Sequence, residues 1–115
     1  MEVQATLRHL RMTARKGRLV ADLVRGRACG EALALLRATP KSASRPLAKL
    51  IRSALANAQE KNARDRAGID LDALYIKRVQ VDEGARMWRI RPRAHGRATW
   101  INKSMSHMTV VLDER

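Results

Sequence analysis

The sequence predicts an α+β fold in which three helices pack on a small antiparallel three-stranded sheet, with a long β-hairpin protruding from it. Three observations lead to this prediction. Three segments repeat apolar residues at helical spacing, alternating segments lie near both ends of the chain, and residues 84–96 have too few apolar side chains to form a core. With 115 residues, the chain fits a single domain over residues 1–115, with the hairpin at about 80–103.

The first strand and the first helix follow one another near the N-terminus. Residues 3–11 alternate apolar and polar side chains, which predicts a half-buried strand. Thr13 is placed to cap a helix over residues 14–25, which ends before Gly26. The apolar residues that recur at helical spacing in it are Leu19, Val20, Leu23 and Val24.

Two more helices are predicted in the next part of the chain. A short one over residues 31–38 ends before Pro40, because the residue preceding a proline avoids helical geometry. A long one begins at Ser42 or Ser44 as the cap and accommodates Pro46 in its first turn. Its expected buried stripe is Leu47, Leu50, Ile51, Ala54, Leu55 and Ala58.

The C-terminal part predicts two long antiparallel strands. Residues 61–72 mix charges around a glycine and are expected to form a surface connection. The segment 74–81 then alternates, with Tyr75, Val79 and Val81 expected on one face, and residues 100–112 contain the β-rich run MTVVL. The basic segment 84–96 between them is expected to form an extended hairpin.

The charge of the chain predicts a polyanionic partner. Its 24 Lys and Arg against 11 Asp and Glu give a net charge of +13. Two stretches, residues 3–21 and 84–112, contain no acid at all. A solvated face would explain one such run, but two runs in so basic a chain favour nucleic acid over an acidic membrane surface. The basic residues also lack the single long amphipathic helix typical of membrane-surface binding.

Other sequence features bear on the compartment. No segment is apolar enough for a signal peptide or a membrane span, and the single cysteine, Cys29, fits a reducing compartment as a small buried side chain. We therefore expect a soluble cytoplasmic protein.

Residue patterns typical of catalysis or metal binding are not recognisable in the sequence. Ser106 and His107 are adjacent on a predicted strand and point to opposite faces, so they cannot form a dyad, and His107 is interpreted as a structural or RNA-contacting histidine. Cys29 and the three histidines lack the paired spacing of a zinc site. For Trp88, base stacking, contact with a second partner and packing all stay open. A general RNA chaperone or a DNA-architectural protein would share the same charge.

Five short motifs follow one another along the chain: RMTARKGRLVADLVRG at 11–26, SALANA at 53–58, VDEG at 81–84, RPRAHGRA at 91–98 and SHMTVV at 106–111. In this order they resemble the bacterial family of large ribosomal subunit protein twenty-two. The resemblance covers nearly the whole chain. One difference from the family pattern is Trp88, which stands where a lysine is typical.

This resemblance implies a structural, non-enzymatic protein without cofactor, metal or catalytic residues. It would bind 23S-type ribosomal RNA of the large subunit, support assembly and line the nascent-peptide exit tunnel with its hairpin. Its implied partners are that RNA, neighbouring ribosomal proteins and the nascent peptide, with no membrane and no homo-oligomer. The residues expected to bind RNA are Arg8, Arg11, Arg15, Lys16, Arg18, Arg25, Arg86, Arg89, Arg91, Arg93, His95, Arg97, Lys103, Ser106 and His107. The expected hairpin tip comprises Met87, Trp88, Arg89, Ile90 and Arg91.

Overall fold

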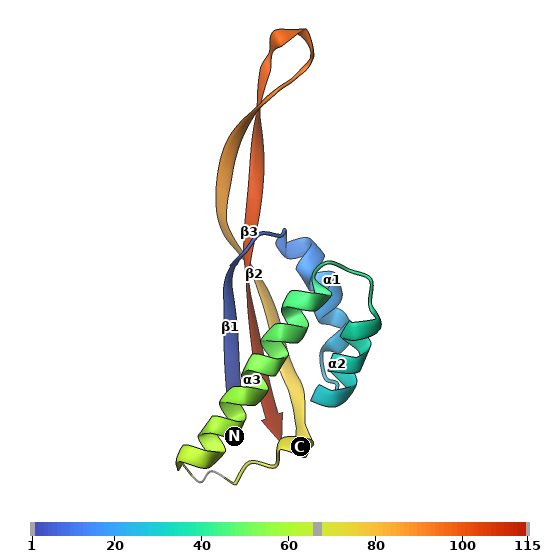
Figure 1. The fold of residues 1–115 in the computed structure, drawn as a ribbon, viewed down its shortest axis with the longest axis vertical. Coiled ribbons are helices and arrows are strands. Elements are labelled where there is room, and N and C mark those ends of the chain that lie inside the picture. The colour runs from blue at the N-terminus through green and yellow to red at the C-terminus, as the bar shows by residue number, and fades with distance from the viewer. Residues whose placement is uncertain (1, 66–67, 115) are drawn as a thin grey trace.

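A computed structural model describes residues 2–65 and 68–114 as a three-stranded antiparallel sheet with three helices (Figure 1). The sheet order is β1-β3-β2, so the last strand lies between the other two. The prediction of an α+β fold with a long hairpin is confirmed. The elements are β1 (Val3–Leu10), α1 (Ala14–Val24), α2 (Cys29–Ala38), α3 (Ser44–Asp65), β2 (Leu74–Pro92) and β3 (Ala98–Glu114), with short 3-10 turns η1 (Leu71–Ala73) and η2 (Ala94–Gly96).

The core lies at one end of an elongated molecule that measures 65 × 28 × 16 Å. Alternation buries one face of the sheet, because Val3 and Ala5 are covered while Gln4 between them is exposed. The last buried residues towards the hairpin are Val81 on β2 and Ser106 on β3. Beyond them the two strands continue as a ribbon without a core (Figure 1). The largest fully buried apolar side chains are Leu47, Ile51, Leu74, Ile76, Met108 and Leu112.

Helix α1 begins as predicted but buries a different set of side chains. The Thr13 hydroxyl accepts a hydrogen bond from the Lys16 backbone N–H at 3.5 Å, which confirms the N-cap. Leu19 and Leu23, expected in the apolar stripe, are 57% and 42% exposed. The small residues of α1 face the sheet instead, so the helix can approach it closely: Ala14, Gly17 and Ala21 are buried together with Val20 and Val24.

Two helix boundaries differ from the sequence predictions by two residues or more. Helix α2 begins at Cys29, two residues before the expected start, and its N-cap residue makes no side-chain hydrogen bond. Helix α3 continues to Asp65, so the first part of the expected surface connection at 61–72 is helical. The Asn62 side chain bonds the end of α3 to the segment that follows it. Its Nδ2 donates to the Ile69 carbonyl and its Oδ1 accepts from the Ile69 N–H, both at 2.7 Å. Residues 66 and 67 lie outside the described residues.

A β-bulge shifts the buried face of β2. The register with β3 skips Lys77 between Ile76 and Arg78, which moves the alternation by one residue. As a result Ile76 shares the buried face with Val79, and Tyr75, expected beside Val79, is only half-buried. The prediction missed the bulge because a register shift depends on the partner strand.

The turn of the hairpin lies farther along the chain than expected. Residues 87–91, expected at the tip, are paired with residues 99–103 of β3, and pairing continues to Pro92 and Ala98. The turn is made by η2, in which His95 and Gly96 have φ angles of 63° and 68°. Such left-handed backbone suits glycine best, and the RPRAHGRA motif supplies one at this position.

Candidate nucleic-acid interface

The two acid-free stretches of the sequence meet where the hairpin leaves the globular domain. A surface hollow of about 630 Å³ is lined by Arg11 from the connection before α1, by Lys16 from the first turn of α1 and by Lys103 from β3. A neighbouring hollow of about 270 Å³ brings Arg15 of α1 next to Arg86 of β2, together with Glu83 as its one acid. Side chains separated by some 70 to 90 positions in the chain therefore form one basic surface. The positive end of the α1 dipole adds to the same potential.

The cations of this surface have no acidic partners within residues 2–65 and 68–114. Ion pairs there engage only four basic residues, namely Arg25, Arg27, Arg64 and Lys77. Unneutralised cations that repel one another are stabilised by phosphates from a partner. The arrangement therefore suits a polyanion.

The hairpin carries its cations on exposed positions along its whole length. Arg89 and Arg91 lie on one face of β2. Lys103 of β3 lies on the same face, because it pairs with Met87, two positions before Arg89. Arg86 lies on the opposite face near the base. The turn region adds three exposed side chains, Arg93, His95 and Arg97. Arg8 on β1 is exposed as well.

Two of the arginines expected to bind RNA also hold the fold together. Because β2 is an edge strand, its outward carbonyls have no partner in the sheet. The Arg18 Nε donates to the Val81 carbonyl at 3.0 Å, and Arg25 Nη2 donates to the Val79 carbonyl at 2.9 Å. Arg25 also pairs with Asp22. These contacts join α1 to the strand that becomes the hairpin.

Ser106 and His107 differ in accessibility from the other expected RNA-binding residues. Ser106 is fully buried and its hydroxyl has no hydrogen-bond partner among the described residues, so RNA cannot reach it in this conformation. His107 accepts a hydrogen bond from the His9 N–H through Nδ1 at 3.0 Å, and the two rings meet edge to face at 5.1 Å. A Cβ on Gly84 would lie 3.0 Å from His107 Nε2, so this glycine lets the histidine pack at the base of the hairpin.

Sequence reasoning missed a second basic surface, between α2 and α3. No acid occurs at residues 32–59, and a hollow of about 1150 Å³ is lined by five exposed cations from this stretch. The sequence contains a signal for this surface, because three of the five cations follow the i, i+4, i+7 spacing of one helix face. Ser42 borders both this hollow and the one at the hairpin base, so the two basic surfaces are continuous. The five cations are Arg37, Lys41, Arg45, Lys49 and Arg52.

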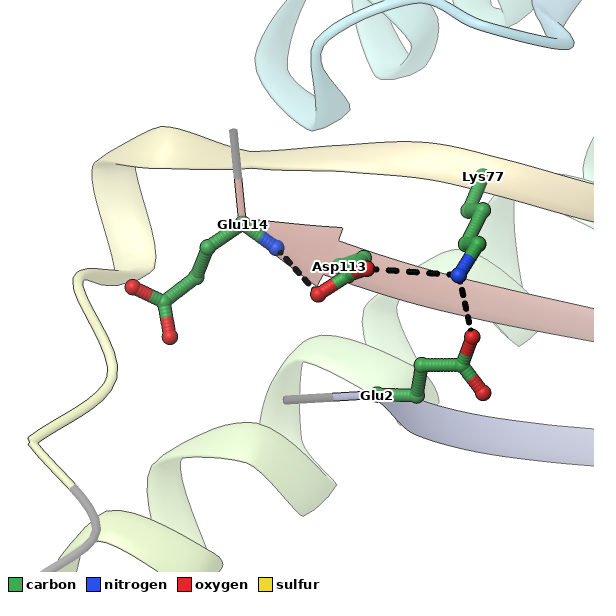
Figure 2. Close-up of polar contacts among 4 residues, drawn as sticks. All are labelled: Glu2, Lys77, Asp113 and Glu114. Atoms are coloured by element: carbon green, nitrogen blue, oxygen red, sulfur yellow. Dashed lines mark hydrogen bonds and ion pairs between the residues drawn. The ribbon is translucent and has the colours of Figure 1, made fainter.

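Acidic residues gather at the opposite end of the molecule, where both termini lie (Figure 1). Figure 2 shows Lys77 between Glu2 and Asp113, with Nζ 3.5 Å from the Asp113 carboxylate. The hydrogen bond and charge of Lys77 lower the pKa of Glu2. The same interaction with Glu2 raises the pKa of Lys77. A hydrogen bond from the Glu114 N–H, at 2.8 Å, is the main cause of the lowered pKa of Asp113. Acidic side chains are thus present at this end of the molecule and absent from residues 84–103 of the hairpin.

The model of the ribosomal protein L22p/L17e family matches residues 5–113 of the chain. The chain belongs to this family. As a member of the L22p/L17e family it is a structural protein of the large ribosomal subunit that binds ribosomal RNA and associates with ribosomal proteins. The basic surface at the hairpin base is the part of the molecule best suited to that RNA.

Three further features of this L22p/L17e member concern metal ions, membranes and thiol chemistry. Within the described ranges, no group of three or more His, Cys, Asp or Glu side chains is placed to hold a metal ion. None of the described helices combines the length and apolar character needed to cross a membrane. Cys29 is buried, and burial raises the pKa of its thiol to about 11, so the thiolate is scarce at neutral pH.

Proposed function

We propose that the chain binds large-subunit ribosomal RNA along one continuous basic surface, which runs from the hairpin past the start of α1 to the hollow between α2 and α3. The observation that carries this proposal is the meeting of Arg11 and Lys16 with Lys103 around one hollow. Phosphates bound there release condensed counterions, which drives binding. The acidic end with both termini faces away from the RNA.

The strength of this binding depends on salt. If about eight phosphates are neutralised, the logarithm of the affinity falls with the logarithm of the salt concentration at a slope of roughly −6 to −7. Arg91 and Arg93 stand on the accessible part of the hairpin. Replacing both with Ala is expected to weaken binding and to flatten the slope by about two.

The hairpin extends into the nascent-peptide exit tunnel and places its turn at the wall. Its two strands have no core beyond Val81, so the surrounding RNA supplies the contacts that hold them in place. The exposed turn with Arg93, His95 and Arg97 then lies nearest the nascent peptide. The expected tip residues 87–91 lie along the paired strand behind it.

The same geometry supports a role in assembly. Basic side chains on α1, on α3 and on the hairpin face different RNA segments along a molecule 65 Å long. A single copy can therefore bridge RNA segments that are distant in sequence and favour their compact arrangement. Neighbouring ribosomal proteins are expected beside it, with no second copy of the chain.

Photocrosslinking tests the placement of the hairpin. A photoreactive amino acid replaces His95 in the turn or Glu60 on the exposed acidic end, and each variant is incorporated into ribosomes that carry a stalled, labelled nascent peptide. We expect crosslinks to the nascent peptide from position 95 and none from position 60. Large subunits that contain both variants but give no crosslink from position 95 would contradict the tunnel placement.

A further inference from the structure

One face of the hairpin is apolar and aromatic. Side chains alternate along each strand, so Trp88 and Ile90 share a face of β2. Trp100 stands directly opposite Ile90 in the register, and Trp88 is its diagonal neighbour. Arg89 and Arg91 occupy the other face. Beyond Arg86, which lies on the aromatic side at the base of the hairpin, the ribbon therefore carries its tryptophans on one face and these two arginines on the other.

No part of the described chain covers this face. Trp88, Ile90 and Trp100 are 55%, 60% and 65% exposed, and together with Leu19 and Leu23 they are the large apolar side chains most open to solvent. The buried core ends at Val81, well before these residues. Isolated aromatic side chains are common on surfaces, whereas clustered exposed apolar side chains are typical of interaction sites.

We propose that Trp88, Ile90 and Trp100 form a stacking platform for unpaired bases of the ribosomal RNA, an inference that rests on the proposed function. Charge selects this occupant. No acid occurs between Glu83 and Asp113, so every Lys, Arg, Asp or Glu side chain of the hairpin near this face is a cation. A single-stranded RNA segment supplies bases for the aromatic rings and phosphates for those cations, whereas a protein would have to combine apolar and acidic side chains in one site.

Ile90 has a supporting role in this platform. It follows Trp88 on the same face of β2 and stands directly opposite Trp100, so it extends the apolar surface across both strands. Bases of any identity have a π-face, so the platform is expected to select unpaired over paired RNA rather than one sequence. This selection distinguishes it from the basic surface, which binds phosphates of either form.

Intrinsic fluorescence of the full chain tests the platform, because both tryptophans of the protein lie on this face. The probes are a short single-stranded oligoadenylate and an RNA duplex of the same length. We expect the single strand to quench the tryptophans, and the duplex to bind through its phosphates without quenching. Trp88→Ala and Trp100→Ala are each expected to lower the affinity for oligoadenylate about tenfold and to leave duplex binding unchanged.

Two control variants separate stacking from charge. Trp100→Phe should retain most of the affinity for oligoadenylate, since a phenyl ring also stacks. Arg89→Ala, on the opposite face, should weaken both RNAs and flatten the salt slope while the quenching at saturation persists.

Several outcomes would overturn the platform. Equal quenching by the duplex, or equal losses for both RNAs in the tryptophan variants, would assign these side chains no base contact. Quenching by a leucine-rich peptide but not by oligoadenylate would make the face a protein-binding surface. If RNA binding remains steeply salt-dependent in these experiments, such results would contradict the platform but not the proposed function. Absence of the wild-type protein from salt-washed large subunits would instead remove the proposed function itself.

Discussion

Arg18 on α1 donates a hydrogen bond from Nε to the main-chain carbonyl of Val81 across 3.0 Å. Val81 is the last buried residue of β2 before the strand leaves the core. The bond therefore joins the helix that carries one acid-free stretch to the start of the hairpin that carries the other. It is a direct contact between the two basic segments at the point where they meet.

Loss of this bond should destabilise the domain. Arg18→Ala leaves an edge carbonyl of β2 without its charged donor, and we expect the free energy of unfolding to fall by about 1–2 kcal/mol. Urea unfolding measures the change. Arg8→Ala is the matched control, because Arg8 is exposed and has no partner among the described residues. A value for Arg18→Ala as small as that for Arg8→Ala would show that the bond contributes nothing to stability.

The close approach of α1 to the sheet depends on Gly17. A Cβ at this position would lie 3.0 Å from Met108 Cε and 3.1 Å from Val81 Cγ1. We expect Gly17→Ala to lower the free energy of unfolding by about 1–2 kcal/mol, because a methyl group overfills this contact. Gly30→Ala in α2 meets open space, so the gain in helix propensity should stabilise the protein by up to about 1 kcal/mol. Two variants that change stability in the same direction would refute this packing.

The cluster of Glu2, Lys77 and Asp113 should make stability sensitive to acid. The pKa values of both carboxyl groups are lowered in the folded protein, so their contribution is present above their ordinary pKa and is lost as the pH falls through the lowered values. The pKa of Lys77 is raised, so its contribution is lost only as the pH rises through that raised value.

Glu2→Gln tests this prediction through urea unfolding at neutral and at acidic pH. The variant should be less stable than the wild type at neutral pH, and the difference should disappear in acid once Glu2 is protonated in both states. Asp82→Asn serves as the control, since Asp82 is exposed without a partner in the described part of the chain. A difference that persists unchanged in acid would contradict the role of this ion pair.

Local signals in the sequence were sufficient for much of the fold. The Thr13 cap and the periodicity of the long helix depend on neighbours in the chain, and both were predicted. The bulge at Lys77 was not, because it depends on the register with β3. Leu19 and Leu23 have the spacing of core residues, but Gly17, which has no side chain, lies against the sheet and leaves them exposed.

The sequence predicted which segments of the candidate interface are basic, but not how these segments come together in space. Both acid-free stretches were visible in the sequence, whereas their meeting around Lys16 and Lys103 depends on the tertiary fold. The sequence could not show that Ser106 is buried or that His107 bonds the His9 backbone, because both contacts depend on strand pairing. The spacing of the cations on α3 was a local signal that sequence reasoning missed.

The salt dependence of RNA binding by a pair of lysine variants tests most directly whether the two acid-free stretches form one RNA-binding surface. Lys16 of α1 and Lys103 of the hairpin line the same hollow, and the variants are Lys16→Ala and Lys103→Ala. Arg64→Ala is the control, because Arg64 pairs with acids at the far end of the molecule. On a large-subunit RNA fragment each lysine variant should flatten the log–log salt slope by about one, and the double variant by about two. Arg64→Ala should leave the slope unchanged. Unchanged slopes for both lysine variants, or a change for Arg64→Ala as large as theirs, would contradict a binding surface at the base of the hairpin.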